Sequence, residues 1–118
     1  MGKSKSSSAT VRHSGNVAII DLSGRITMND GAGSIRSAVE GVLAGGHKSI
    51  LLNLGAVEYL DSASLGEMSS AYIMVARQGG KLKLLNPQPK VHNLLQVTRL
   101  YSLFVSFAEE SAAVASFR

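Results

Sequence analysis

Two glycine pairs divide the chain into units that each pass from a helix to a strand. Gly45-Gly46 follows one helical stretch, and Gly79-Gly80 follows a second. Glycine often ends helices because it adopts the left-handed conformation that a C-terminal cap requires. A short apolar run comes after each pair, at 50–54 and at 82–85. The succession strand, helix, strand predicts two parallel strands joined by a right-handed crossover.

Both helical stretches have the apolar spacing of amphipathic helices. The first is expected to begin at an N-cap, Ser34, and its apolar residues repeat at i, i+3, i+4, i+7 and i+8. These residues are Ile35, Ala38, Val39, Val42 and Leu43. The second is expected to open at 61–64. Its expected buried face consists of Leu65, Met68, Tyr72, Val75 and Ala76.

Short β-rich runs and turn residues account for most of the remaining chain. Further strands are expected at 9–13, 17–22 and 103–105, a polar loop at 25–33, and short helices after Pro89 and at 111–117. This order of elements predicts an α/β fold with one mixed sheet of about five strands, flanked by helices.

Composition excludes several classes of protein. A chain of 118 residues suits one domain, and the absence of cysteine excludes a disulfide framework or a cysteine-ligated metal. Residues 1–8 form a Lys/Ser-rich tail that is expected to be disordered, and the folded domain is expected to span 9–118. Lys3, Lys5 and Arg12 carry most of the net charge of +4, so the folded part is nearly neutral and binding to nucleic acid is not expected. No apolar run is long enough for a membrane span or a signal sequence, so a cytoplasmic location is expected.

The sequence contains no recognisable catalytic or metal-binding motif. His13, His47 and His92 lack the spacing of metal ligands, so neither a metal nor a cofactor is expected. There is no Gly-x-Ser-x-Gly motif, and the glycines at 41–46 precede a strand, whereas a phosphate-binding loop precedes a helix. We therefore do not expect an enzyme.

The segment Asp61-Ser62-Ala63-Ser64 connects a buried strand to a helix. Asp and Ser are preferred N-caps because their side-chain oxygens accept hydrogen bonds from free backbone N–H groups. On the residues alone, a cap is the favoured interpretation. The alternative is a covalent switch, since a phosphoserine at a helix N-terminus is stabilised by the helix dipole and adds about −1.5 to −2 charges to the surface.

Several segments together resemble the STAS domain, which is shared by sulfate-transporter tails and bacterial anti-sigma factor antagonists. The resemblance extends from about Val11 to Phe117. The segments that carry it, in order, are 20–26, 51–54, 59–66, 79–82 and 91–95. It implies a central sheet with helices packed mainly on one face.

The resemblance also implies a phosphorylation-switched binding module. In that family the unmodified antagonist binds an anti-sigma factor, usually a serine kinase of the histidine-kinase-like ATPase group, and frees a sigma factor. The kinase phosphorylates the serine after the aspartate, the complex dissociates, and a phosphatase restores the antagonist. By position this serine is Ser62. Stressosome-type scaffolds and lipid-transport accessory domains share the fold, and they represent the alternative function without a switch.

Two regions depart from the common family pattern. Members commonly read Asp-Ser-Ser/Thr-Gly-Leu-Gly, whereas this chain has Ala63 and Ser64 at the third and fourth places. Ser64 thereby supplies a second candidate hydroxyl for phosphorylation. Thr27 stands where many antagonists carry an aspartate. The residues expected to contact the partner are Thr27, Asn29, Asp61, Ser62, Ala63, Ser64, Gly66 and Glu67.

Overall fold

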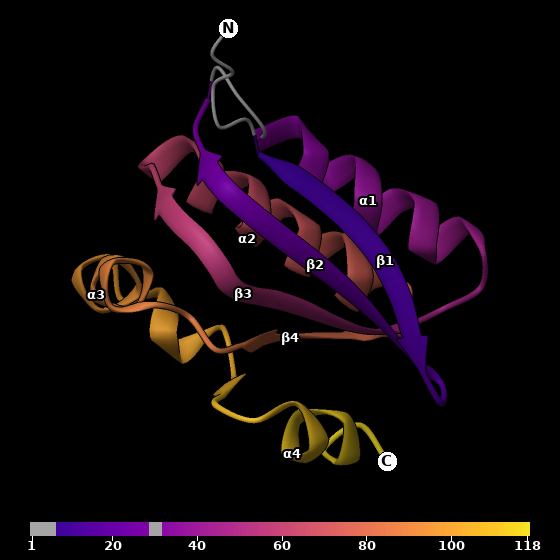
Figure 1. Ribbon diagram of the computed structural model, residues 1–118. Coiled ribbons are helices and arrows are strands. Elements are labelled where there is room, and N and C mark those ends of the chain that lie inside the picture. The colour runs from indigo at the N-terminus through magenta and orange to yellow at the C-terminus, as the bar shows by residue number, and fades with distance from the viewer. Residues whose placement is uncertain (1–6, 29–31) are drawn as a thin grey trace, which may run out of the picture.

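A mixed β-sheet forms the centre of the molecule (Figure 1). The computed structural model describes residues 7–28 and 32–118. The five strands, in their order across the sheet, are β1 (Ser8–Ser14), β2 (Val17–Ile26), β3 (Ser49–Leu60), β4 (Lys81–Leu85) and β5 (Ser106–Phe107). β1 and β2 pair in antiparallel fashion, and the other neighbours pair in parallel. The predicted mixed α/β sheet is therefore confirmed.

The helices cover the two faces of the sheet unequally. α1 (Ala32–Ala44) and α2 (Ser62–Arg77) lie side by side on one face, above the larger of two apolar clusters (Figure 1). The short α4 (Glu110–Ala115) packs on the other face, above the smaller cluster. α3 (Pro89–Val97) packs beside β3 and is followed by a 3₁₀ turn (Leu100–Ser102). Most helical cover is thus on one face, as expected.

The central strands are buried on both faces. In β3, Ile50 and Leu52 contribute to the larger cluster and Leu51 to the smaller, and all three are fully buried. A nearly continuous apolar run is typical of a strand covered on both sides, because alternate side chains enter different layers. The sequence prediction for this strand is confirmed in type and place.

β2 and β3 are longer than predicted. β3 continues through the expected loop to Leu60, and β2 continues to Ile26. The register between them shifts twice, between Asp21 and Ser23 and between Gly24 and Arg25. Each shift places an extra residue on β3, so the buried positions there, Leu54, Val57 and Leu60, are three apart. Buried and exposed residues therefore do not alternate here, and the sequence lacks the pattern by which a strand is recognised.

The strand predicted at 103–105 is wrong. These residues lie outside any strand, and β5 comes immediately afterwards at Ser106–Phe107. Phe104 is buried instead, with its ring edge-on to Tyr72 at a centroid distance of 5.6 Å. The apolar residues at 103–105 therefore anchor the chain in the core through Phe104, and they do not form a strand of the sheet.

Two helical details also differ from the prediction. α1 begins at Ala32, so Ser34 lies inside the helix and is not its N-cap. On α2, Ala76 is exposed and Ala71 is buried in its place. The remaining residues of the predicted α1 stripe are buried or half-buried as expected.

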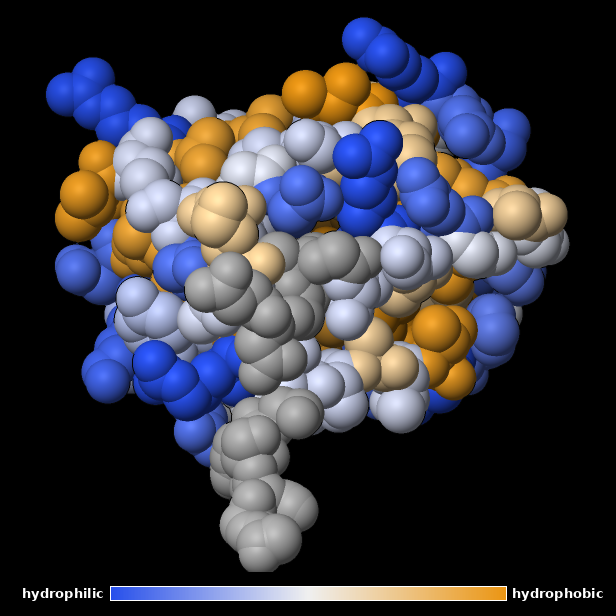
Figure 2. Space-filling model, turned by 90° about the horizontal axis from the view of Figure 1, so that it is seen from above, coloured by the Kyte–Doolittle hydropathy of each residue, from blue (hydrophilic) through white to orange (hydrophobic). Residues whose placement is uncertain are grey.

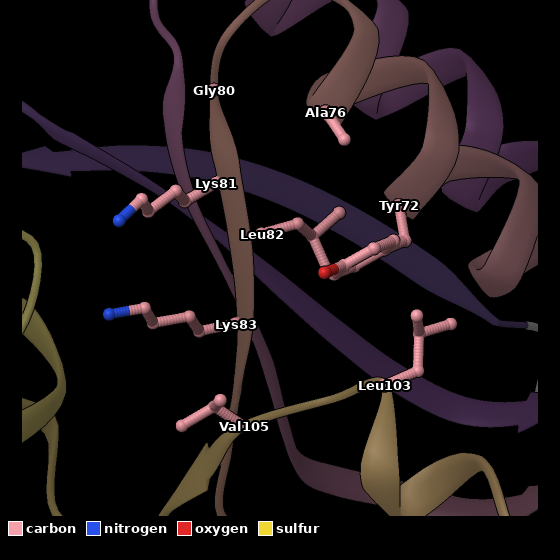
Figure 3. Close-up of a pocket in the computed structure, with 8 residues that line it drawn as sticks. All are labelled: Tyr72, Ala76, Gly80, Lys81, Leu82, Lys83, Leu103 and Val105. Atoms are coloured by element: carbon pink, nitrogen blue, oxygen red, sulfur yellow. The ribbon is translucent and has the colours of Figure 1, made fainter.

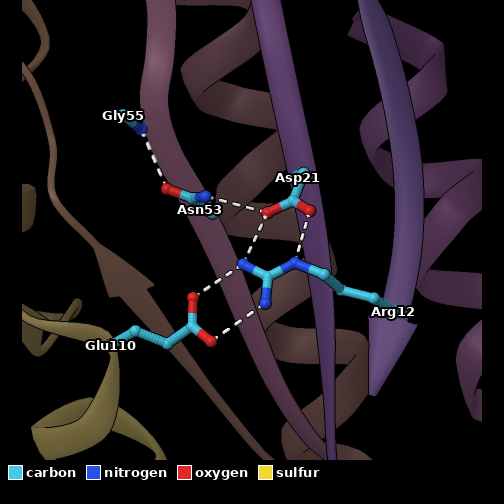
Figure 4. A network of polar contacts seen from close by, with 5 residues as sticks. All are labelled: Arg12, Asp21, Asn53, Gly55 and Glu110. Carbon is cyan, nitrogen blue, oxygen red and sulfur yellow. Dashed lines mark hydrogen bonds and ion pairs between the residues drawn. The ribbon is translucent and has the colours of Figure 1, made fainter. Parts of the chain in front are cut away.

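A polar network ties α4 to the first two strands (Figure 4). The Arg12 guanidinium donates two hydrogen bonds to Asp21, at 2.6 and 3.1 Å, and two to Glu110, at 2.9 and 2.7 Å. Asn53 donates to Asp21 at 2.8 Å and accepts from the Gly55 N–H at 3.0 Å. The hydrogen bonds from Arg12 lower the pKa of both carboxyl groups, although partial desolvation opposes this shift.

Replacing Arg12 with Gln is expected to destabilise the protein at neutral pH by about 1 kcal/mol, a modest value because the three side chains are partly exposed. Carboxyl groups with a lowered native pKa stabilise the fold above their unfolded pKa values, about 3.9 for Asp and 4.3 for Glu. This contribution is lost as the pH falls through the native values. Urea unfolding of both proteins from about pH 3 to about pH 7 should therefore show a difference that shrinks with acidification. A difference that stays constant would contradict the assignment.

Gly80 allows β3 and β4 to begin their pairing at close range. A Cβ at this position would overlap the carbonyl oxygen of Lys48 and lie 2.9 Å from a methyl carbon of Val75. The next residue, Lys81, donates its N–H to that same carbonyl at 2.8 Å. The second glycine of the pair is therefore required by packing, whereas Gly79 has a positive φ of 79°.

Gly80→Ala is expected to lower the free energy of unfolding by about 1–3 kcal/mol, since the added methyl group must displace backbone. The control is Gly66→Ala in α2, where an added Cβ meets nothing within 4 Å. Alanine's better helix propensity is expected to leave that variant unchanged or more stable by up to about 1 kcal/mol. Urea denaturation measures both changes. A Gly80→Ala protein as stable as the wild type would contradict the close approach.

Candidate functional site at the start of α2

Asp61 fastens the start of α2 to the end of β2. One of its carboxylate oxygens accepts from the Ser64 N–H at 2.8 Å, as an N-cap does, and the other accepts from the Met28 N–H at 2.9 Å. The Asp61 N–H donates to the Ile26 carbonyl at 3.3 Å. Desolvation acts to raise the pKa of the Asp61 carboxyl, but the hydrogen bonds outweigh it and the pKa lies below its ordinary value. Asp61 is therefore an ionised positioning residue near neutral pH.

Ser64 is not a surface residue, contrary to the prediction. Its side chain is fully buried, and its hydroxyl donates to the Ile26 carbonyl at 2.9 Å. The serine that replaces the common glycine thus points inward and adds a second link between α2 and β2. In this conformation its hydroxyl is accessible neither to a partner nor to a kinase.

Ser62 has the opposite environment. It is the first residue of α2 and is exposed, and no described residue forms a hydrogen bond with its hydroxyl. The helix cap is Asp61 and not Ser62. Ala63 and Gly66 are exposed and Glu67 is half-buried. Because helix neighbours three and four apart share a face, Gly66 lies beside Ser62 and Glu67 beside Ala63.

The end of β2 lies against this segment. Ile26 and Met28 supply the backbone groups that bind Asp61 and Ser64, so the intervening Thr27, which is half-buried, is brought close to the start of α2. Asn29, the remaining predicted contact, lies outside the described residues.

The sequence did not indicate that α3 borders the same site. A hollow of about 340 Å³ next to Ser62 is lined by both β3 and α3. Its lining residues are Tyr59, Leu60, Asp61, Ser62, Lys90, Asn93, Leu94 and Val97. The α3 residues Lys90, Asn93 and Val97 are exposed and spaced by three and four, which marks one helix face. The spacing of these residues can be read from the sequence, but their position beside Ser62 cannot.

Apolar groups reach the surface around the Ser62 hydroxyl. Val97 is 71% exposed, Met28 68% and Tyr59 36%, and the Arg25 guanidinium lies 4.5 Å from the centre of the Tyr59 ring. Figure 2 views the molecule from the upper side of Figure 1, toward which β2 and β3 run, and shows hydrophobic side chains emerging between hydrophilic ones. Such a mixed surface is suited to reversible contact with another protein.

A second hollow lies elsewhere. It measures about 410 Å³ and is bordered by α2, β4 and the segment before β5 (Figure 3). Tyr72 and Leu103 face it, whereas the Lys81 and Lys83 side chains point away from them (Figure 3). Lys83 instead donates to the carbonyl and hydroxyl of Ser116, each at 3.0 Å. The described residues that line this hollow include no carboxylate and no histidine.

The described residues contain neither a cluster of metal-ligating side chains nor a helix that could span a membrane. Among residues 7–28 and 32–118, no three His, Asp or Glu side chains lie close enough to hold a metal ion together. None of the helices in this part of the chain has the length and hydropathy needed to cross a bilayer.

Comparison with known proteins assigns the family. The family model of the STAS domain matches residues 8–113, and the chain therefore belongs to the STAS domain family. A relative from Paenibacillus polymyxa, named anti-sigma F factor antagonist, is 24% identical over 104 residues, which cover 88% of this chain and 89% of the relative.

Solved structures agree with this assignment. A crystal structure from Thermotoga maritima, described as a candidate anti-sigma factor antagonist, has a TM-score of 0.85 and 25% identity, covering 93% of this chain and 94% of that one. The Bacillus cell fate determinant SpoIIAA in its phosphorylated form has a TM-score of 0.72 and 20% identity, covering 94% of this chain and 100% of that one. The predicted fold and the resemblance to STAS domains are thus confirmed.

The two serines are expected to differ in their effect on stability. Ser64→Ala removes a buried hydrogen bond and should cost about 1–2 kcal/mol. Ser62→Ala removes an exposed hydroxyl and should change stability by less than about 0.5 kcal/mol. Thermal and urea unfolding of the two variants provide the measurement. If Ser62→Ala were as destabilising as Ser64→Ala, Ser62 would have a structural role that the geometry does not show.

Proposed function

We propose that this protein is an anti-sigma factor antagonist that binds its partner through the surface around Ser62 and releases it when Ser62 is phosphorylated. One observation carries the proposal: the Ser62 hydroxyl is exposed at a helix start that the hydrogen bonds of Asp61 and Ser64 tie to the end of β2, while the neighbouring Ser64 hydroxyl is buried. Relatives described as anti-sigma factor antagonists support the role. A similar fold solved in a phosphorylated form supports the modification.

The proposed docking surface consists of Ser62 and its exposed neighbours. Burial of Met28, Tyr59 and Val97 by a partner would supply apolar contact area, and Ala63 adds a small group beside the hydroxyl. Gly66 has no positive φ, and an added Cβ there would meet nothing within 4 Å, so the fold does not require glycine. A close approach of the partner to the α2 backbone would explain why position 66 is a glycine.

Phosphorylation changes this surface more than the fold. In the free protein the phosphate would be near the positive end of α2, and Lys90 in the adjoining hollow offers a cation. In a complex, the same dianion would be desolvated next to the ionised Asp61, which is held in place by its hydrogen bonds. Moving a complex from mostly bound to mostly free requires a change in affinity of about 10⁴-fold.

The partner is proposed to be an anti-sigma factor that is itself a serine kinase of the histidine-kinase-like ATPase group. In the transfer step, the Ser62 hydroxyl oxygen bonds to the γ-phosphorus of ATP, ADP leaves, and a base of the kinase accepts the hydroxyl proton. A phosphatase then hydrolyses the ester. This chain acts as the substrate in both steps and supplies no catalytic group.

Binding to a purified kinase partner tests the switch. Ser62→Ala is expected to bind as tightly as the wild type, whereas Ser62→Asp is expected to weaken binding at least tenfold, about 1.4 kcal/mol. The control is Ser70→Asp, which adds the same charge to an exposed position two turns further along α2. Isothermal titration calorimetry measures the affinities of the wild type and the three variants. Equal binding by Ser62→Ala and Ser62→Asp would contradict the switch.

The site of modification is tested separately. With the kinase and ATP, intact-mass analysis should show one added phosphoryl group on the wild type and on Ser64→Ala, and none on Ser62→Ala. Phosphate mapped to Ser64, or no incorporation into any of the three proteins, would contradict the assignment of Ser62.

A further inference from the structure

The outer edge of β1 has no backbone partner in the described part of the chain. β1 is the first strand of the sheet and pairs only with β2, in an unbroken register from Ser8 opposite Ser23 to Ser14 opposite Val17. At 3.4 Å per residue, its seven residues extend over roughly 24 Å. Edge strands are commonly protected by proline, by bulges or by being very short. β1 has none of these protections.

The turn after β1 determines which residues face this open edge. Gly15 and Asn16 form a two-residue turn, and Gly15 has a φ of 61°. In such hairpins the flanking residues form a hydrogen-bonded pair, and hydrogen-bonded and non-bonded pairs then alternate. Every second residue counting back from Ser14 therefore bonds to β2. The intervening residues, whose N–H and C=O groups point to the open edge, are His13, Val11 and Ala9.

We propose that β1 pairs with β1 of a second copy of this chain. The two strands would run antiparallel around a two-fold axis at Val11, the middle residue of the strand, and join the two five-stranded sheets into one. Val11 would face Val11 of the second copy, and Ala9 would face His13. All three outward-pointing positions then exchange two hydrogen bonds per pair, so the edge is complementary to itself.

The side chains along β1 agree with this pairing. Val11 is 45% exposed and borders a hollow of about 310 Å³ between β1 and α1, lined also by Ala38, Gly41 and Val42. A valine of the second copy would cover this apolar surface. The His13 ring already contacts the His47 ring, at a centroid distance of 4.5 Å, and the small Ala9 opposite it leaves that contact room.

Charge does not oppose the pairing. Arg12 would face Thr10 of the second copy, so no like charges meet across the axis. Its guanidinium is also occupied by Asp21 and Glu110 on the opposite face of the sheet. Ser62 is at the far end of β3, two strands away from this edge, and would stay free in both copies. The proposed dimer therefore does not depend on the proposed switch.

Sedimentation velocity of the full chain, from about 5 µM to about 500 µM, tests the proposal across the usual range of weak to moderate association. The wild type should shift from monomer to dimer with concentration. Val11→Lys and Val11→Glu each place like charges at the axis and should remain monomeric, whereas their equimolar mixture should form a heterodimer. Val105→Lys is the control, since Val105 is a 54% exposed valine far from this edge; it should dimerise as the wild type does.

A monomeric wild type over the whole range, or dimers of Val11→Lys alone, would overturn the proposal. Amide hydrogen exchange tests it without any substitution. The amides of Val11 and His13 should exchange more slowly as the wild-type concentration rises, while those of Thr10 and Arg12 should be protected at every concentration. Concentration-independent exchange at Val11 would likewise overturn it.

Discussion

The hydrogen bonds accepted by the Asp61 carboxylate are the interaction on which the candidate functional site depends. Its two oxygens bind backbone N–H groups from two elements that are far apart in sequence, Met28 after β2 and Ser64 in α2. Ser64 adds a buried bond in the reverse direction, from its hydroxyl to the Ile26 carbonyl. These bonds join the end of the strand to the start of the helix. Ser62, which lies between Asp61 and Ser64, is therefore held at the surface although its own side chain forms no bond to the described residues.

This arrangement separates the structural roles of the segment from its proposed chemical role. A cap residue must keep its side chain engaged, whereas a modified residue must keep its side chain available. Here Asp61 and Ser64 meet the first requirement, and the exposed side chain of Ser62 is compatible with the second. Under the proposed switch, phosphorylation of Ser62 would break none of the bonds that hold α2 in place, and the response would be confined to the surface.

The sequence predicted those features that local spacing determines. The layers and the crossover follow from the apolar stripe of α1, the glycine pairs and the apolar run 50–54. The predictions failed where contacts between residues far apart in sequence determine the structure. Phe104 packs against Tyr72 and lies outside the sheet. Ser64 points inward because its hydroxyl donates to the Ile26 carbonyl. The position of α3 beside Ser62 could not be predicted either, because local sequence patterns do not determine which elements lie next to each other.

The unequal cover of the two sheet faces has a dynamic consequence. One face has a large core under α1 and α2, while the other depends on a six-residue helix that rests on a small apolar cluster and on ionic bonds to Arg12. Local opening follows the least costly set of contacts. α4 should therefore detach as a separate cooperative unit before global unfolding, most readily once the pH falls below the lowered pKa values of Asp21 and Glu110, and leave the remainder of the molecule native.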